Sequence, residues 1–298
     1  MDVAKRNALG LTPLSPQIAA IAALKTHEDV AGMMGQALMP SFISAGVGTD
    51  AKNPKRYFVK ISQSGLGLPS PEYYLTAGGA YDGLRTAYLA HIKDVFTRAG
   101  VRDANARSKA VLDLETRMAG LFWTAAQKRD PVKGYKLMTR DALEAYAHGF
   151  SWGPFMDASG FGGVKEVVLS TDTSVQALAK LFSETDVETM KAYLTFHYID
   201  SLAFLLSEDW ETADFAFRSA LLQGIAEQDS RENRAMATIG VLLAEPLGHA
   251  YAKAYFPEDD RAKMEELVAN IRAAFKARLE ANVWMDEATR ERALGKLA

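Results

Sequence analysis

The sequence contains no cysteine among its 298 residues. Without cysteine the chain has no disulfide, no thiolate nucleophile and no zinc site built from thiolates. The absence does not fix the compartment, because a large domain can be stable in an oxidising space without disulfides. Histidine is scarce as well, with five residues. Several classes of catalytic and metal site are therefore excluded before any motif is considered.

An excess of one charge sign is also missing. The 34 Lys and Arg residues against 37 Asp and Glu residues give a formal net charge of −3, so nothing favours binding to nucleic acid or to an anionic membrane. No apolar run approaches the roughly 20 residues that span a bilayer. The opening MDVAKRNALGLTPLSP lacks the apolar core of a secretory signal. The residues alone thus predict no nucleic-acid partner and no membrane segment, and they leave the compartment open.

The zinc-binding motif HExxH is not present. It needs two histidines four residues apart with a glutamate after the first. His27 and Glu28 begin such a motif, but position 31 is Ala31, so we interpret the pair as the solvated first turn of a helix. We expect His197, between two aromatic residues, to be hydrogen-bonded and partly buried. The sequence predicts no metal ligand, and the remaining histidines are interpreted as packed or surface residues: His91, His148 and His249.

Other catalytic signatures are missing too. There is no GxSxG, no P-loop and no GxGxxG, and Ser64-Gly-Leu-Gly67 lacks the third glycine. The carboxylate pairs Glu208–Asp209 and Glu265–Glu266 are interpreted as helix starts and exposed faces rather than as a glycosidase pair. An aromatic stripe is interpreted as core: Tyr193, Phe196, Tyr198 and Phe204. The sequence predicts no catalytic residue in this chain.

What the sequence does contain is helical periodicity over most of its length. Hydrophobic residues make up 48%, charged residues 24% and aromatic residues 10%, which is typical of a globular protein. Apolar residues at steps of three and four predict a mainly α, multi-helical lobe, one domain over 1–298. The expected helices cover residues 12–24, 26–38, 81–99, 103–126, 139–146, 173–182, 187–205, 215–225, 230–255 (bent at Pro246 and Gly248), 264–284 and 286–298.

One stretch has strand and turn character instead. Turn formers over Asp50–Pro54 separate two strand-like runs, Phe42–Val47 and Tyr57–Ile61, and so predict a small β-hairpin near 42–61. Residues 65–69 follow as GLGLP, in which Gly65 and Gly67 allow unusual backbone angles. The apolar group Tyr73–Leu75 is expected to anchor this loop. A very short strand is expected at 167–169, and residues 129–139 are expected to be a connector.

These segments resemble a known family. VGTDAKN, GLGLP and YYL, in this order and spacing, are similar to the N-terminal region of the neprilysin and endothelin-converting-enzyme family of zinc metallopeptidases. Further segments match the family in order over essentially the whole chain: Leu112-Asp-Leu-Glu115 with Trp123, Arg129-Asp130 with Lys133 and Tyr135, Gly248 with Tyr251 and Phe256-Pro257, and Trp284-Met-Asp286 with Thr289, Ala293 and Lys296.

The resemblance implies a helical lobe that covers the active-site cavity of a zinc metalloendopeptidase and limits substrate size. The family's HExxH, its third zinc ligand and its substrate-holding Asn-Ala pair all lie downstream of the segment that resembles 284–296. No catalytic or zinc residue is therefore carried over, and zinc is expected in the missing catalytic domain. The implied partners are that catalytic domain and short peptide substrates, and the implied compartment is periplasmic or extracellular.

The end of the chain adds one expectation. The final helix, from Asp286, shows no Gly or Pro stop after Leu297, which favours a chain that continues toward the catalytic domain. An apolar surface facing the cavity is then expected to be exposed. The alternative is a non-enzymatic helical scaffold that binds a peptide or protein and derives from such a peptidase.

Overall fold

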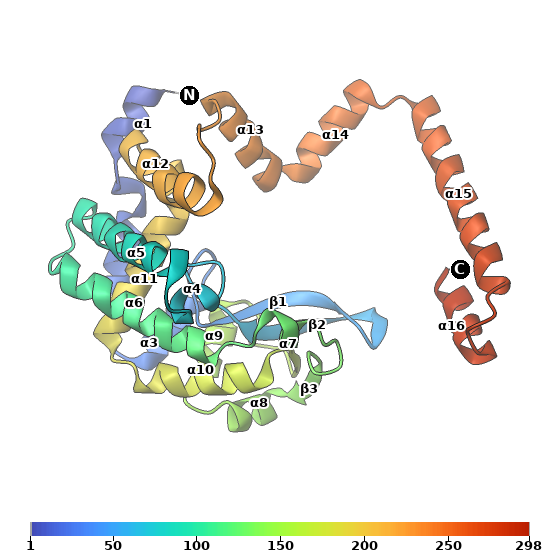
Figure 1. The fold of residues 1–298 in the computed structure, drawn as a ribbon, viewed down its shortest axis with the longest axis horizontal. Helices are drawn as coiled ribbons and strands as arrows, with labels where there is room; N and C mark the ends of the chain where they lie inside the picture. The colour runs from blue at the N-terminus through green and yellow to red at the C-terminus, as the bar shows by residue number, and fades with distance from the viewer. Residues whose placement is uncertain (1, 298) are drawn as a thin grey trace. The chain divides into compact units, whose positions relative to one another are not determined.

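A computed structural model describes residues 2–297, and its contacts divide the chain into two compact units, Met1–Ala226 and Glu227–Ala298 (Figure 1). Both units are dominated by helices, so the mainly α class is confirmed. The assignment of 1–298 to one substrate-access domain stays a prediction. Each unit is described below by itself.

The first unit is a layered bundle of helices around a small sheet. Its helices are α1 (Val3–Leu9), α2 (Ser15–Ala23), α3 (His27–Met34), α4 (Glu72–Leu75), α5 (Gly79–Arg98), α6 (Ala104–Leu121), α7 (Ala125–Lys128), α8 (Arg140–Tyr146), α9 (Trp152–Ala158), α10 (Asp172–Glu184), α11 (Val187–Leu202) and α12 (Glu208–Asp214). Two 3-10 turns, η1 (Thr12–Leu14) and η2 (Ala203–Leu205), and a π-helix, η3 (Phe215–Leu221), complete it.

The sheet has four strands in the order β1-β2-β4-β3. The expected hairpin is confirmed and is longer than predicted, with β1 (Ile43–Asp50) antiparallel to β2 (Asn53–Gln63). The short strand expected at 167–169 is β4 (Glu166–Leu169), which pairs in parallel with β2. The connector assignment of 129–139 is wrong at its end, because β3 (Lys136–Thr139) pairs with β4. The two strands are far apart in the sequence, so no local pattern of residues predicts that they pair.

The core of this unit lies where α5, α6 and α11 pack together. Each helix contributes one apolar face at the predicted three- and four-residue spacing. Burial of these faces supplies the main stabilisation, at roughly 25 cal/mol per Å² of apolar surface. The fully or nearly fully buried residues on the three faces are Tyr88, Ile92 and Phe96, then Val111, Leu114 and Met118, then Tyr193, Phe196 and Ile199.

Several helix predictions need correction. The helix expected through residue 126 ends at Leu121, because Phe122 adopts an extended conformation and Thr124 starts α7 with a capping box to Gln127. The expected helices do not include α9, which follows Phe150. Phe204 of the aromatic stripe is 45% exposed, because the turn η2 ends the helix before it.

The second unit consists of α13 (Arg231–Leu242), α14 (Ala244–Tyr255), α15 (Glu258–Glu280) and α16 (Glu287–Leu297). The break between α13 and α14 falls at Leu243 rather than at Pro246 and Gly248. Proline excludes a helical hydrogen bond to the carbonyl four residues earlier, so Pro246 is accommodated in the first turn of a new helix. Asp286 caps α16 as expected, accepting a hydrogen bond of 2.8 Å from the Thr289 N–H.

Helix α15 presents an apolar stripe that its own unit does not cover. Leu267, Ile271 and Phe275, at steps of four, are 49%, 59% and 53% exposed. Among the described residues of this unit, Leu279 is the buried one. Exposed apolar patches of this kind are typical of surfaces that bind a protein, a membrane or a ligand. Within residues 2–297, no helix is both long enough and apolar enough to cross a membrane.

We predict that the double substitution Leu267→Gln and Ile271→Gln lowers binding of the neutral dye Nile red, since it removes the centre of the stripe. The melting temperature should change little, because both side chains are half-exposed. Fluorescence titration and thermal unfolding measure the two effects. Glu266→Gln on the same helix is the control, and equal dye binding by the double variant and the control would contradict the prediction.

Candidate functional site

The loop that joins β2 to α4 depends on its two glycines. Gly65 has φ +102°, and a Cβ there would lie 2.4 Å from the Tyr193 hydroxyl oxygen. A Cβ on Gly67 would lie 1.8 Å from the Tyr88 hydroxyl oxygen. The first glycine is needed for its backbone angle as well as for space, and the second for space alone. Glycine is therefore required at both positions of GLGLP because the loop packs directly against the hydroxyl groups of two buried tyrosines.

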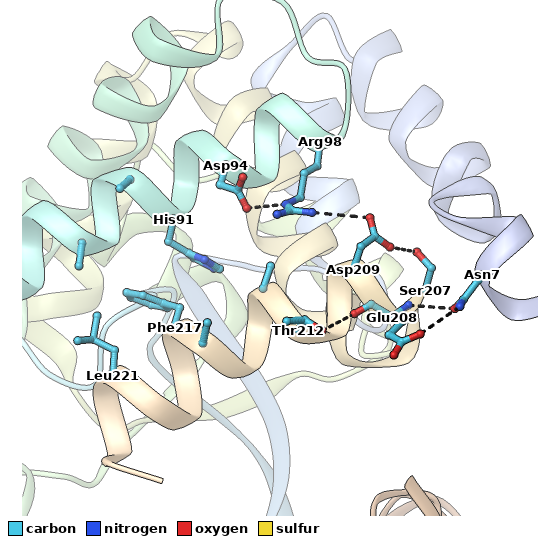
Figure 2. A pocket seen from close by; sticks show the side chains of 14 residues that line it. Asn7, His91, Asp94, Arg98, Ser207, Glu208, Asp209, Thr212, Phe217 and Leu221 are labelled. Atoms are coloured by element: carbon cyan, nitrogen blue, oxygen red, sulfur yellow. Dashed lines mark hydrogen bonds and ion pairs between the residues drawn. The ribbon is translucent and has the colours of Figure 1, made fainter. Parts of the chain in front are cut away.

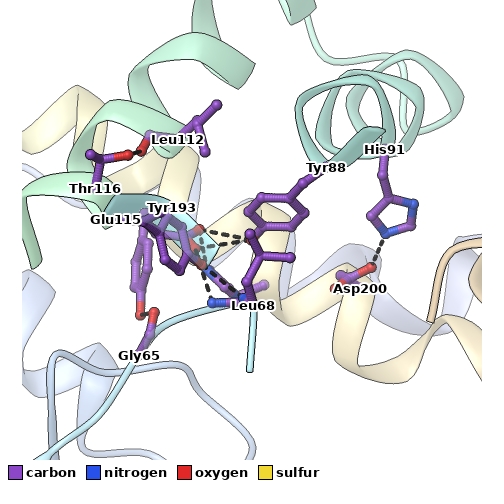
Figure 3. Close-up of polar contacts among 12 residues, drawn as sticks. Gly65, Leu68, Tyr88, His91, Leu112, Glu115, Thr116, Tyr193 and Asp200 are labelled. Atoms are coloured by element: carbon purple, nitrogen blue, oxygen red, sulfur yellow. Dashed lines mark hydrogen bonds and ion pairs between the residues drawn. The ribbon is translucent and has the colours of Figure 1, made fainter. Parts of the chain in front are cut away.

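A single buried glutamate on α6 holds this loop (Figure 3). The Gly67 N–H donates to Glu115 Oε2 at 2.9 Å, and the Tyr74 hydroxyl donates to the same oxygen. The Tyr88 hydroxyl lies 2.9 and 3.0 Å from the two carboxylate oxygens, and His197 Nε2 lies 2.9 Å from Oε1. One side chain thus ties together the loop, α4, α5, α6 and α11. We call Glu115 with these donors the Glu115 cluster.

Two further hydrogen bonds fix the loop on either side of Gly67. The Leu68 N–H donates to the Tyr74 hydroxyl at 2.8 Å, and the Tyr193 hydroxyl donates to the Gly65 carbonyl at 2.8 Å. Burial, and then the neighbouring Glu115, raise the pKa of Tyr74 and Tyr88. Both phenols therefore keep their protons and act as donors. With Glu115 fully buried and its oxygens occupied by these donors, the cluster is suited to support rather than to acid-base catalysis.

A second buried carboxylate ties α5, α11 and η3 together. Asp200 Oδ1 accepts from His91 Nε2 at 2.6 Å, and Oδ2 accepts from Arg218. The His91 ring stacks on Phe217 with centroids 4.3 Å apart. Burial alone would raise the pKa of Asp200, but the His91 hydrogen bond and the Arg218 charge outweigh it and lower this pKa. The π-helix places Phe217 and Arg218 for these contacts.

A pocket of about 950 Å³ lies beside this second cluster (Figure 2). Asn7 of α1 accepts from the Glu208 N–H at 3.1 Å and so secures the start of α12. Arg98 bridges Asp94 at 2.6 Å and Asp209 at 3.7 Å. Glu208–Asp209 thus starts a helix, as the sequence predicts. The polar side chains at this pocket are engaged with one another, which favours a structural role for them.

Across residues 2–297 the structure shows no group of three or more His, Asp or Glu side chains arranged to hold a metal ion. The expectation that this chain supplies no catalytic residue and no zinc ligand stays a prediction. Two histidines, His91 and His197, pair with the buried carboxylates described above. His27 is only half exposed: its Nε2 lies 3.0 Å from the Thr185 carbonyl oxygen and its ring packs edge-on against Phe182. Glu28 is exposed to solvent, as predicted, whereas the prediction that His27 is solvated is wrong.

Comparison with known proteins identifies the family to which this chain belongs. A family model described as Peptidase family M13 matches residues 1–298. The chain belongs to peptidase family M13. It is 26% identical over 262 residues to the endothelin-converting enzyme 1 of Homo sapiens and to that of Cavia porcellus, covering 86% of this chain and 34% and 35% of theirs. The resemblance inferred from the sequence is confirmed, and this chain corresponds to the N-terminal domain of these neprilysin-like zinc metallopeptidases.

Solved structures of related proteins have the same fold as this chain. The zinc metalloprotease Zmp1 of Mycobacterium tuberculosis in its open state is 28% identical with a TM-score of 0.88, and its inhibitor complex is 27% identical with a TM-score of 0.89. Each comparison covers 99% of this chain and 47% or 46% of the Zmp1 chain. PepO from Lactobacillus rhamnosis, at 19% identity and a TM-score of 0.82, shares the fold. The chain spans about a third of the length of the curated relatives and under half of the solved chains.

Within the first unit, segments that carry the M13 resemblance meet in space. GLGLP, the YYL segment and the Glu115 segment converge in the Glu115 cluster. The Tyr135 hydroxyl donates to Asp50 at 2.9 Å, which joins the K-Y segment to the end of VGTD. The Trp123 N–H donates to the Gln63 side chain at 2.8 Å. These matches therefore record contacts that hold the hairpin and its following loop in place.

Sequence reasoning missed the role of Glu115. A signal for it was available, because Glu115 lies among Val111, Leu114 and Met118 on the apolar face of a helix, where a carboxylate is either misplaced or buried with partners. The anchor expected at Tyr73–Leu75 is mainly Tyr74, whereas Leu75 is 52% exposed. His197 is hydrogen-bonded and largely buried, as predicted.

We predict that Gly67→Ala destabilises the protein by about 3 kcal/mol, because the new methyl group overlaps the Tyr88 hydroxyl and displaces it from Glu115. Chemical denaturation measures the change. Gly120→Ala is the matched control, since Gly120 lies in α6 with nothing within 4 Å of an added Cβ; it should stabilise by about 1 kcal/mol. Equal unfolding midpoints for the two variants would contradict the proposed packing.

The second cluster gives a pH-dependent prediction. Burial, and then the neighbouring Asp200, raise the pKa of Asp214 from 3.8 to about 6. The folded protein therefore binds this proton more tightly than the unfolded chain, and stability is lost as pH rises from about 4 to about 6. Asp214→Asn removes this loss, so the variant should exceed the wild type by about 1 kcal/mol at pH 8 and be close to it at pH 4, after allowance for partial exposure.

Urea unfolding at the two pH values measures this difference. Asp209→Asn is the control: the Ser207 hydrogen bond lowers the pKa of Asp209, so its replacement brings no gain at pH 8. If Asp214→Asn showed the same stability offset from wild type at both pH values, the raised pKa would be refuted.

Proposed function

We propose that this chain is the lobe of a neprilysin-like zinc metalloendopeptidase that covers the active-site cavity and limits the size of the peptides that enter. The observation that carries the proposal is the family match over the whole chain, together with its coverage of less than half of the related zinc metalloprotease chains. The sequence contains no HExxH, so the zinc and the water that it activates belong to the remainder of the protein.

The rigid support around the hairpin suits such a role. A lobe that limits access must keep its wall in place while substrates of different sequence enter. The Glu115 cluster fixes the loop after the hairpin through the backbone N–H groups of Gly67 and Leu68, and the Tyr193 hydroxyl fixes it through the Gly65 carbonyl. The Tyr135–Asp50 hydrogen bond fixes the other end of the hairpin. In this proposal the chain contributes walls and positioning, and no reacting group.

The second unit supplies the surface for the catalytic domain. The apolar stripe of α15, at Leu267, Ile271 and Phe275, is half-exposed within its unit. Trp284, in the segment before α16, is 76% exposed. Burying these side chains against the catalytic domain would contribute roughly 25 cal/mol for each Å² of apolar surface removed from water. The partner in this proposal is the catalytic domain of the same peptidase.

The test uses this chain and the catalytic domain of the same protein, produced separately. The 298-residue chain alone should carry no stoichiometric zinc by mass spectrometry of metals and should not cleave a quenched fluorescent peptide. Adding the catalytic domain should give cleavage of the peptide but not of a folded protein that displays the same sequence. The control is the catalytic domain alone, which should lose this discrimination between peptide and folded protein.

Two outcomes would contradict the proposal. Zinc near one ion per chain with peptidase activity in this chain alone would place the chemistry here. Cleavage of the folded protein at the same rate with and without this chain would show that the lobe does not restrict access.

A further inference from the structure

The first strand of the sheet has a free edge. In the order β1-β2-β4-β3, β1 is an outer strand. The Ser64 N–H donates to the Phe42 carbonyl, and in the antiparallel register hydrogen-bonded pairs alternate, so residues 44, 46 and 48 face β2. The backbone N–H and C=O groups of Ala45, Val47 and Thr49 then face away from the sheet. Among residues 2–297 the structure shows no hydrogen-bond partner for these outward groups.

This edge lacks the usual protection against pairing with another strand. Proteins shield outer strands with charged residues, proline or short length. From Ile43 to Thr49, β1 has neither charge nor proline, and its bulge comes at the very end, between Thr49 and Asp50. The opposite edge, β3, is four residues long and begins with Lys136. The β1 edge is therefore the longer and less protected of the two edges of the sheet.

A pocket of about 710 Å³ opens at the beginning of β1. Ile43 and Ala45 of β1 line it together with apolar side chains from neighbouring elements, among them Met39, Phe155 and Phe161. Its volume is sufficient for one or two large apolar side chains. A strand added to β1 would place its side chains alternately toward and away from this pocket.

The other end of the hairpin is basic. Lys52 and Lys55, in and next to the hairpin turn, are exposed. The acidic residue of the tip, Asp50, is buried and accepts from Tyr135. Along the strand this basic end lies roughly 20 Å from the pocket, about six residues at about 3.3 Å each. The free edge thus runs from an apolar pocket to a positively charged tip.

We propose that β1 binds an extended peptide as an added antiparallel strand, with an apolar side chain in the pocket and an acidic side chain near the lysines. Main-chain hydrogen bonds to Ala45, Val47 and Thr49 would supply affinity, and the pocket and lysines would supply selectivity. The inference deepens the proposed function, on which it rests for the presence of peptides, by naming a peptide-anchoring strand in the access lobe. Strand addition requires no change in the β1–β2 ladder.

The experiment uses the 298-residue chain and a dye-labelled ten-residue peptide with one Leu and one Glu about six residues apart, followed by fluorescence anisotropy. Val47→Pro removes one outward N–H and blocks strand addition while leaving the ladder to β2 intact. It should weaken binding about tenfold or more. The matched control Val47→Ala keeps the N–H and should bind within about threefold of the wild type.

A second measurement does not depend on how the variant folds. Methylating alternate peptide nitrogens on the wild-type chain should abolish binding in one register and spare it in the other, since only every second N–H of the peptide faces β1. Replacing the peptide Glu by Gln should weaken binding, and this difference should shrink at high salt.

Binding that is equal for both methylated peptides, or unaffected by Val47→Pro, would overturn the inference. A wild-type dimer in sedimentation that Val47→Pro dissociates, without peptide binding, would assign the edge to a second copy of the chain and would also overturn it. Because the assay needs neither zinc nor cleavage, failure of the complementation test would refute the proposed function and leave this result standing.

Discussion

The fold of the first unit depends on one buried carboxylate with a full set of donors. Removing a carboxylate from water costs several kcal/mol, and hydrogen bonds must offset that cost. Glu115 receives them from Gly67, Tyr74, Tyr88 and His197. The same cost makes the arrangement specific, because a loop or helix in any other place would leave the buried charge without its donors.

The charged residues that look reactive in this chain are used in the same way. Asp200 binds His91 and Arg218 between three helices, and Asp214 shares Arg218 at 3.4 Å. Both buried clusters lie where helices cross, and both join residues far apart in the sequence. Their side chains hold backbone segments from different helices in position. The surfaces that remain available are of another kind, namely a free strand edge and an apolar helix stripe.

In the proposed function these features would serve different purposes. The tight support behind GLGLP and at the hairpin end would give the proposed access lobe a wall that resists displacement. The free edge of β1 starts beside that support, so a peptide bound there would be held by a rigid strand. The α15 stripe, half-exposed within its own unit, is suited to burial against another domain. The rigid support and the free edge of β1 thus belong to the first unit, and the apolar stripe belongs to the second.

Local sequence pattern determined the helices and the hairpin, because periodicity and turn residues act over a few neighbouring residues. The glycines at 65 and 67 marked an unusual loop, but the need for Gly67 comes from its contact with Tyr88. The family was also readable from the ordered segments. The pairing of β3 and β4 with the hairpin, the break at Leu243 and the half-buried state of His27 were not.

Only the tertiary structure decided which donors surround Glu115 and Asp200, since these lie up to 109 residues away in the sequence. Whether a carboxylate on a helix is solvated or buried depends on what the fold brings to it. The sequence fixes which groups can pair, and the packing of distant helices selects the pairs that form.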